Sequence, residues 1–229
     1  MTTISANLQA VLARIHDAAK KSGRNPDDIS LLAVSKTWPA SAVREAANAG
    51  QTAFGENYVQ EGVDKVAELS ALGLDWHFIG PLQSNKTRRV AESFAWVHSI
   101  DRLKIAERLS EQRPDGLPPL QVCLQVNVSG EETKSGIALE EIEELARQLM
   151  LLPRLKLRGL MTIPAPVEDF ALQRQAFQRL RELFDHLNNT GFSLDTLSMG
   201  MSHDLEAAIA EGATMVRVGT AIFGERTYV

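Results

Sequence analysis

The sequence predicts an α/β protein of the TIM-barrel class, a closed (β/α)8 barrel with one extra helix at the N-terminus. Short apolar runs alternate with longer segments of helical spacing along the chain, and this order favours a parallel sheet. Eight such units fit into 229 residues at about 29 residues each, so we expect a single domain over residues 1–229. The alternative is an open doubly wound sheet, but no glycine-rich nucleotide-binding loop follows any of the strands.

The individual elements follow from the spacing of the apolar residues. Residues 4–19 have apolar side chains at helical spacing, and a basic turn and Gly23 come after them, which indicates the extra helix. Residues 29–35 form an apolar run that is too short for a helix and is typical of a strand buried on both faces. Further strands are predicted at 52–55, 76–79, 95–100, 120–128, 157–161, 194–199 and 214–218. The helices between them are predicted at 39–50, 56–70, 86–93, 101–113, 139–151, 169–189 and 204–210.

The composition is that of a globular protein and excludes several classes of function. Hydrophobic residues at 44% and charged residues at 23% exclude a disordered or fibrous chain. The 24 basic and 29 acidic residues give a net charge of −5, which argues against nucleic acid or a membrane surface as a partner, so any anion site must be local. No apolar run reaches the roughly 18 residues of a membrane helix, and the first residues do not form a signal peptide, so we expect a cytoplasmic protein.

The cysteine and the histidines do not indicate a metal site. Cys123 is the single cysteine and lies among apolar neighbours, which predicts a packed core thiol. The histidines lack the spacing of a metal-binding motif. His77 falls within a predicted strand, and we interpret it as a core histidine whose ring is satisfied by backbone groups, rather than as a catalytic base or metal ligand.

Lys36 is the most informative residue for function. In a closed parallel barrel the functional face is formed by the C-terminal ends of the strands, and Lys36 comes directly after the first predicted strand. Desolvation at this position disfavours the ammonium form and favours a nucleophilic amine. Such a lysine forms a Schiff base with the carbonyl of a sugar phosphate or of pyridoxal phosphate. The structural alternative is a lysine that extends from the strand end into water.

Two segments near the C-terminus are typical of a phosphate site. Residues 198–202 and 218–221 follow the seventh and eighth predicted strands, whose loops bind phosphate in many barrels. Their small residues allow backbone N–H groups to approach an anion, and Ser and Thr add hydroxyl donors. Ser202 near a helix start is also consistent with ordinary helix capping.

Arg217 lies between apolar neighbours in the eighth predicted strand, where a guanidinium is costly without a partner. Two partners are open from the sequence. One is an acidic side chain such as Glu225 or Glu56, and the other is a ring atom of a ligand.

Several short motifs together carry a family resemblance. They are Ala33-Val34-Ser35-Lys36, Phe54-Gly55-Glu56-Asn57-Tyr58, His77-Phe78-Ile79-Gly80-Pro81-Leu82-Gln83-Ser84-Asn85-Lys86, Gly159-Leu160-Met161, Leu197-Ser198-Met199-Gly200-Met201-Ser202 and Val216-Arg217-Val218-Gly219-Thr220-Ala221-Ile222-Phe223-Gly224. Over nearly its whole length the chain resembles the pyridoxal phosphate homeostasis protein family, also called the YggS or PROSC family. The resemblance implies the barrel half of the alanine-racemase-like fold, a fold type III barrel that binds pyridoxal 5'-phosphate (PLP).

The resemblance also implies a role for individual residues. Lys36 would be the lysine of the internal aldimine, and Arg217 would face the pyridine nitrogen and keep it unprotonated, which weakens the electron sink of the ring. Asn57 and Met161 would line the pocket. The phosphate would be held by backbone and hydroxyl donors of Ser198, Met199, Ser202, Gly219 and Thr220.

Three functions are compatible with these residues. The first function, which the family resemblance implies, is that of a protein that binds and carries PLP and keeps it available to apo-enzymes without substantial amino-acid turnover. The second is a PLP-dependent racemase or decarboxylase; racemases of this fold use a tyrosine from a second domain as a second base, and here only Tyr58 and Tyr228 exist. The third is an aldolase-like enzyme for a sugar phosphate, which leaves Arg217 without a role.

Two further expectations concern the exterior. Lys134 lies in the loop after the fifth predicted strand, and we interpret it as a solvated lysine rather than as a contact for an outgoing anion. We also expect a monomer, because the second domain that builds the racemase dimer does not fit into this length.

Overall fold

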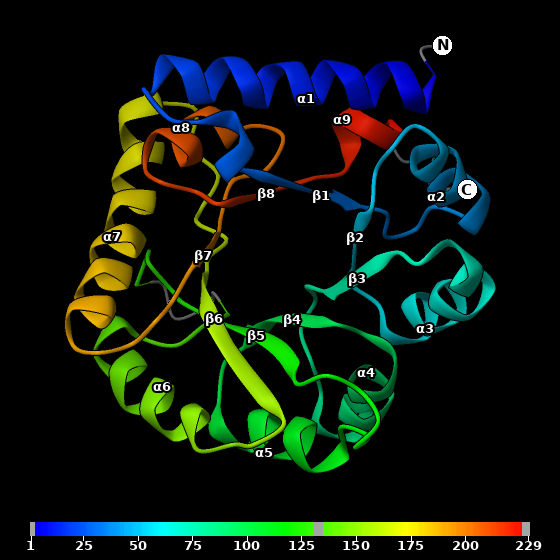
Figure 1. Ribbon diagram of the computed structural model, residues 1–229. Coiled ribbons are helices and arrows are strands. Elements are labelled where there is room, and N and C mark those ends of the chain that lie inside the picture. Colours follow the sequence, from blue (N-terminus) through cyan, green and yellow to red (C-terminus); the bar gives the residue numbers. More distant parts are fainter. Residues whose placement is uncertain (1–2, 131–134, 226–229) are drawn as a thin grey trace.

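The computed structural model describes residues 3–130 and 135–225, and in this part of the chain eight parallel strands close into a barrel in sequence order (Figure 1). The expected (β/α)8 fold is therefore confirmed. Lys134 lies outside the described residues. The strands are β1 Ser30–Val34, β2 Ala53–Glu56, β3 Asp75–Phe78, β4 Trp96–Ile100, β5 Leu120–Gln125, β6 Leu155–Met161, β7 Thr196–Ser198 and β8 Met215–Val218.

Helices surround the barrel, and the extra helix α1 packs against α8 and α9 beside the strands that close it (Figure 1). The α-helices are α1 Ile4–Lys21, α2 Ala40–Asn48, α3 Val59–Glu68, α4 Thr87–Ser93, α5 Leu103–Gln112, α6 Ile142–Met150, α7 Phe170–Asn189, α8 Leu205–Ala210 and α9 Thr220–Phe223. Short 3-10 turns lie at Pro26–Asp28, Ser70–Leu72, Ser84–Lys86 and Leu139–Glu141. Within the described ranges, no helix combines the length and the apolar character that a membrane crossing requires.

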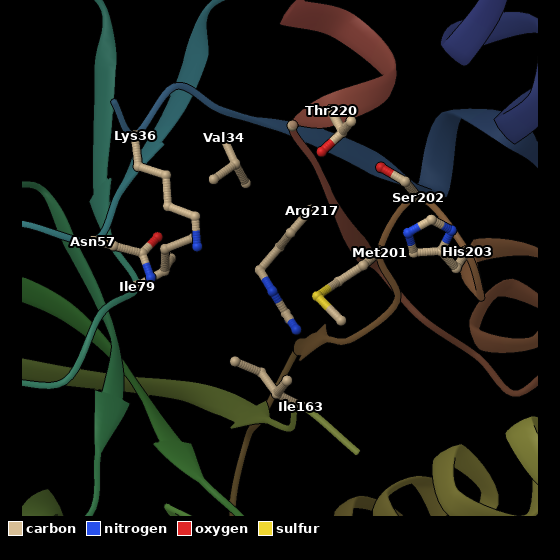
Figure 2. A pocket seen from close by; sticks show the side chains of 11 residues that line it. Val34, Lys36, Asn57, Ile79, Ile163, Met201, Ser202, His203, Arg217 and Thr220 are labelled. Atoms are coloured by element: carbon tan, nitrogen blue, oxygen red, sulfur yellow. The ribbon is translucent and has the colours of Figure 1, made fainter. Parts of the chain in front are cut away.

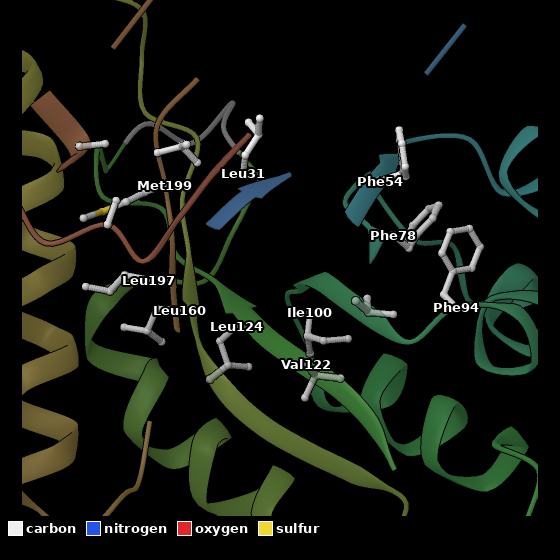
Figure 3. Packing of buried hydrophobic residues seen from close by; sticks show 14 of the residues in the cluster. Leu31, Phe54, Phe78, Phe94, Ile100, Val122, Leu124, Leu160, Leu197 and Met199 are labelled. Carbon is white, nitrogen blue, oxygen red and sulfur yellow. The ribbon is translucent and has the colours of Figure 1, made fainter. Parts of the chain in front are cut away.

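The main hydrophobic core lies between the strands and the surrounding helices. Phe54, Phe78 and Phe94 are fully buried there, and Phe78 and Phe94 meet edge to face with ring centroids 5.5 Å apart (Figure 3). Each buried aromatic side chain contributes about 2–3 kcal/mol through apolar burial. This layer fixes the helices on the outside of the barrel and leaves the inner side chains to form the site.

The barrel interior is smaller and more polar. Cys123 packs there with Trp96 and Met161, and burial raises the pKa of its thiol to about 12, so the predicted core thiol is confirmed. Leu32, Ile79 and Met215 form a second small apolar cluster, and buried serine, histidine and arginine side chains come from β3, β4, β7 and β8. A polar interior of this kind requires internal hydrogen bonds.

Some element boundaries differ from those predicted. The helix expected at 56–70 begins only at Val59, because Glu56 is the last residue of β2. The fifth strand ends at Gln125 rather than at residue 128, because the amide of Asn127 donates to the carbonyl of Ile137 and leaves the ladder with β6. Apolar character therefore overestimated the length of the strand.

Candidate functional site

A pocket of about 180 Å³ opens at the C-terminal ends of the strands. Lys36 and Arg217 are the lysine and the arginine among the lining residues, and none of the lining side chains is a carboxylate. A pocket with two cations and no carboxylate favours an anionic ligand, although the whole chain carries a net charge of −5. The lining residues are Val34, Lys36, Asn57, Ile79, Ile163, Met201, Ser202, His203, Arg217, Gly219 and Thr220.

Lys36 lies two residues after the end of β1 and is half-buried. Figure 2 shows its side chain extending into the pocket toward the space that Arg217 also faces. Asn57, one residue after β2, lies beside it, and its Oδ1 is buried without a hydrogen-bond partner in the described part of the chain. A buried acceptor of this kind indicates a ligand that can donate a hydrogen bond.

A buried ion pair supports the residue that precedes Lys36. Nζ of Lys65 lies 2.7 Å from Oε1 of Glu56, and it also donates to the backbone carbonyl of Ser35 at 2.7 Å. The hydroxyl of Ser35 donates to the same Glu56 oxygen at 2.6 Å. Burial raises the pKa of Glu56, and the positive charge of Lys65 opposes this rise. These contacts hold the backbone in place where the chain leaves β1, directly before Lys36.

A hydrogen bond also fixes the position of Thr37, the residue that follows Lys36. The amide of Thr37 donates to Oε1 of Glu61 at 2.5 Å, and that same carboxylate oxygen accepts from Lys65 at 2.6 Å. Thr37 has φ of 67°, the one described residue other than glycine in the left-handed region. This conformation is strained for a β-branched side chain, so the hydrogen bond to Glu61 stabilises a turn that directs Lys36 into the pocket.

Arg217 on β8 is buried at the inner end of the pocket. One guanidinium nitrogen donates to Oγ of Ser198 at 2.8 Å, and the other donates to the carbonyl of Thr162 at 2.8 Å. Burial lowers the pKa of Arg217 to about 10, and the charge of Asp204 opposes this effect. The group remains protonated at neutral pH.

Of the two partners left open for Arg217 by the sequence, the acidic side chain is not the one found. Glu56 pairs with Lys65 instead, and none of the salt bridges within residues 3–130 and 135–225 joins Arg217 to Glu225 or to another carboxylate. The hydroxyl of Ser198 and the carbonyl of Thr162 accept only two of the five guanidinium N–H groups, so other N–H groups can donate to a ligand in the pocket.

The far end of the pocket is formed by the loops after β7 and β8. The hydroxyls of Ser202 and Thr220 point toward each other there, opposite the amine of Lys36 (Figure 2). The loop after β7 is shaped by Asp204, whose Oδ1 accepts from the amide of Met201 at 2.6 Å. Asp204, not Ser202, occupies the N-cap position of α8, so helix capping does not account for Ser202. At Gly219, a Cβ atom would lie 3.0 Å from the carbonyl oxygen of Val34, which leaves little room for any larger residue.

The structure brings together six of the nine residues predicted for the site: Lys36, Asn57, Ser202, Arg217, Gly219 and Thr220. Met161, Ser198 and Met199 are fully buried and lie outside the pocket lining. The amide of Met199 donates to the carbonyl of Met215 at 3.1 Å, and the hydroxyl of Ser198 is bound to Arg217. Both groups are therefore occupied within the protein itself.

Several pocket residues were missed by the sequence reasoning. Val34, Ile79 and Ile163 supply apolar walls, and Met201 and His203 flank Ser202 in the loop after β7. Ile79 and Ile163 lie one and two residues after their strands, so a count from the strand ends could have found them. Among the described residues, no cluster of histidine, cysteine and acidic side chains is arranged to hold a metal ion.

Comparison with known proteins identifies the family. Residues 6–227 match the family described as alanine racemase, N-terminal domain. The pyridoxal phosphate homeostasis protein of Pseudomonas aeruginosa is 64% identical over 228 residues, covering 100% of this chain and 98% of that relative. This chain belongs to the pyridoxal phosphate homeostasis protein family. Another member, from Escherichia coli, is 58% identical over 231 residues, covering 100% of this chain and 99% of that relative.

Solved structures agree with this family and with the fold. PipY of Synechococcus elongatus, a structure with PLP bound, has a TM-score of 0.81 and 40% identity, covering 92% of this chain and 100% of that chain. Alanine racemase from Corynebacterium glutamicum has a TM-score of 0.68 and 18% identity, covering 94% of this chain and 60% of that chain. The second likeness concerns the fold alone. The resemblance to the pyridoxal phosphate homeostasis protein family is thus confirmed.

Proposed function

We propose that this chain binds PLP in the pocket at the C-terminal face, holds it covalently through Lys36 and serves in its homeostasis and delivery without substantial amino-acid turnover. The observation that carries the proposal is the placement of Lys36 and Arg217 in one pocket that contains no carboxylate. The PLP bound in PipY and the names of the close relatives support it.

The pocket residues fit the groups of PLP. In this proposal Lys36 supplies an amine for the aldehyde, and the hydroxyls of Ser202 and Thr220, which line the opposite end of the pocket, donate to the phosphate. The covalent step is the addition of the Lys36 amine to the aldehyde carbon, which forms a carbon–nitrogen double bond and releases one water molecule. The unpaired Oδ1 of Asn57 supplies an acceptor for a ring substituent. Backbone N–H groups around Gly219 add donors without a side chain in the way.

Arg217 determines what the bound ring can do. A guanidinium is a donor only, so a ring nitrogen that faces it must be the acceptor and stays unprotonated. PLP supplies an electron sink for carbanions when bound, and this sink is weaker without a proton on the ring nitrogen. Ser198, expected among the phosphate donors, acts in this proposal through Arg217 instead.

The second candidate function is amino-acid racemisation or decarboxylation. Tyr58 is the residue that keeps it open, because it lies next to Asn57 at the start of α3 and its side chain is 55% exposed. A racemase needs a second base on the opposite face of the ring from the lysine. We favour the binder, because Arg217 disfavours a protonated ring nitrogen and so weakens the electron sink on which carbanion chemistry in both reactions depends.

Titration of the purified protein with PLP tests binding. We expect a visible absorption band that saturates with PLP, is lost in Lys36→Ala and is retained in Lys104→Ala, a matched change at an exposed lysine on α5. A wild-type protein that develops no band would contradict PLP binding.

Exchange of the α-proton of amino acids in heavy water separates the binder from the enzyme. We expect no exchange above that of free PLP. Exchange that depends on Lys36 and Tyr58 would establish the second candidate function instead.

The proposed carrier role includes two expectations about partners. Delivery to apo-enzymes is expected to restore their activity when loaded protein is the only source of PLP. A monomer is expected in solution, which sedimentation can measure.

A further inference from the structure

Two histidines meet inside the barrel, below the pocket. His77 on β3 and His98 on β4 are both buried, and Nδ1 of His77 lies 2.9 Å from Nε2 of His98. The ring of His77 also stacks on Trp96 with an interplanar angle of 8°. His77 is thus a core histidine as expected, but side chains rather than backbone groups satisfy its ring nitrogens.

These rings belong to a longer chain of hydrogen bonds that crosses the barrel. At one end, Nε2 of His77 lies 3.1 Å from Oδ2 of Asp75, whose side chain is 46% exposed at the start of β3. At the other end, Nδ1 of His98 lies 2.8 Å from Oγ of Ser198, which is the acceptor for Arg217. The chain therefore joins the pocket to the opposite face of the barrel.

Donor chemistry gives every bond in this chain one direction. Arg217 has donors only, so Ser198 must accept from it, and the hydroxyl hydrogen of Ser198 is left for Nδ1 of His98. A neutral His98 then carries its hydrogen on Nε2 and donates to Nδ1 of His77. His77 in turn carries its hydrogen on Nε2 and donates to the carboxylate of Asp75.

The opposite direction leaves groups unsatisfied. With hydrogens on the Nδ1 atoms, His98 would donate to Ser198, and the serine hydroxyl would lose the acceptor for its own hydrogen. A neutral His77 would then present a lone pair to the Asp75 carboxylate, and two acceptors would face each other. Burial lowers the pKa of both histidines, which favours the neutral rings that the first arrangement requires.

We propose that Asp75, His77, His98 and Ser198 form a one-directional hydrogen-bond relay that positions the guanidinium of Arg217 at the inner end of the pocket. His77 and His98 are positioning residues, which act on a ligand only through Arg217. The effect on PLP rests on the proposed function, whereas the direction of the relay is a property of the protein without PLP.

Nitrogen-15 NMR of the histidine side chains in protein free of PLP tests the relay itself. We expect both His77 and His98 to be neutral with the hydrogen on Nε2, and Ser198→Ala to change the signals of His98 most. A hydrogen on Nδ1 of either ring at neutral pH would overturn the proposal. This result does not depend on whether PLP binds.

Variants test the link to the pocket. Ser198→Ala is expected to weaken PLP binding about fivefold and to shift the absorption of the bound form, because Arg217 loses one acceptor. Ser99→Ala is the matched control, because it also removes one buried serine hydroxyl, from the neighbour of His98 that donates to the carbonyl of Gly80. We expect the control to change the affinity by less than about twofold and to leave the absorption unchanged.

Replacement of His98 separates positioning from packing. His98→Asn keeps an acceptor near Ser198, so we expect PLP absorption close to that of the wild type, whereas His98→Leu should resemble Ser198→Ala. If Ser198→Ala and His98→Leu both match Ser99→Ala in affinity and absorption, Arg217 needs no relay and the proposal fails. If the wild type binds no PLP, the proposed function fails, and the NMR result alone decides the relay.

Discussion

Nζ of Lys65 lies 2.7 Å from Oε1 of Glu56, and both side chains are shielded from water next to the backbone that carries Lys36. The structure contains this pair where the sequence suggests only a strand end and a helix surface. Formation of such a pair requires both charges to lose their hydration, which costs free energy. Removal of one partner is strongly destabilising, because the other charge stays buried without compensation.

Replacement of Lys65 is therefore expected to destabilise the folded protein. Lys65→Met should lower the free energy of unfolding by about 3–5 kcal/mol, because Glu56 and Glu61 lose their shared cation. Urea denaturation measures this, with Lys104→Met at an exposed position as the control, which should stay within about 0.5 kcal/mol of the wild type. A loss below about 1 kcal/mol for Lys65→Met would show that the buried pair does not hold this region.

The backbone of Thr37 offers a test of strain beside the lysine. Thr37→Gly should raise the free energy of unfolding by up to about 1 kcal/mol, because glycine adopts a φ of 67° without strain. PLP affinity should fall in the same variant, because the turn that directs Lys36 becomes less fixed. Thr52→Gly, at an exposed threonine without positive φ, should instead destabilise the protein, by about 0.5–1 kcal/mol. Equal losses of stability in both variants would argue against strain at Thr37.

The two ends of the pocket should respond differently to substitution. Arg217→Glu should change the absorption spectrum of bound PLP, because a carboxylate favours a protonated ring nitrogen where the guanidinium disfavours it. Ser202→Ala should weaken binding about fivefold and leave the spectrum unchanged, because it removes one donor at the phosphate end. The opposite pattern, with the spectrum altered only by Ser202→Ala, would place the ring the other way round in the pocket.

The buried histidines predict a dependence of stability on pH. Desolvation lowers the pKa of His77 although Asp75 opposes this. Desolvation lowers the pKa of His98 well below its usual value, and a positive charge on His77, when it is protonated, and the charge of Arg217 add to this effect. As the pH falls below about 6.5, the unfolded chain protonates both residues first. The unfolded state then binds more protons, so the free energy of unfolding decreases by up to about 1.4 kcal/mol per pH unit for each histidine.

Urea denaturation between about pH 7 and pH 5 measures this decrease, and His98→Asn should show a smaller one than the wild type. The comparison removes the contribution of the carboxyl groups, which both proteins share. Identical slopes in the two proteins would mean that His98 does not stay neutral in the folded state.

The sequence was sufficient for the fold because each strand is a short apolar run between polar segments. Lys36 and Arg217 were identifiable for the opposite reason, since a cation beside or inside such a run needs an explanation. The pair of Glu56 and Lys65 was not identifiable, because a lysine on a polar helix is normally solvated. The contact between His98 and Ser198 joins residues 100 positions apart, and only closure of the barrel brings them together.

Reduction of the loaded protein with borohydride, followed by peptide mass mapping, tests whether Lys36 holds PLP covalently. We expect the pyridoxyl group on the peptide that contains Lys36, and no stoichiometric label in Lys36→Ala. A stoichiometric label on another lysine, with Lys36 unmodified, would show that Lys36 does not form the covalent bond to PLP.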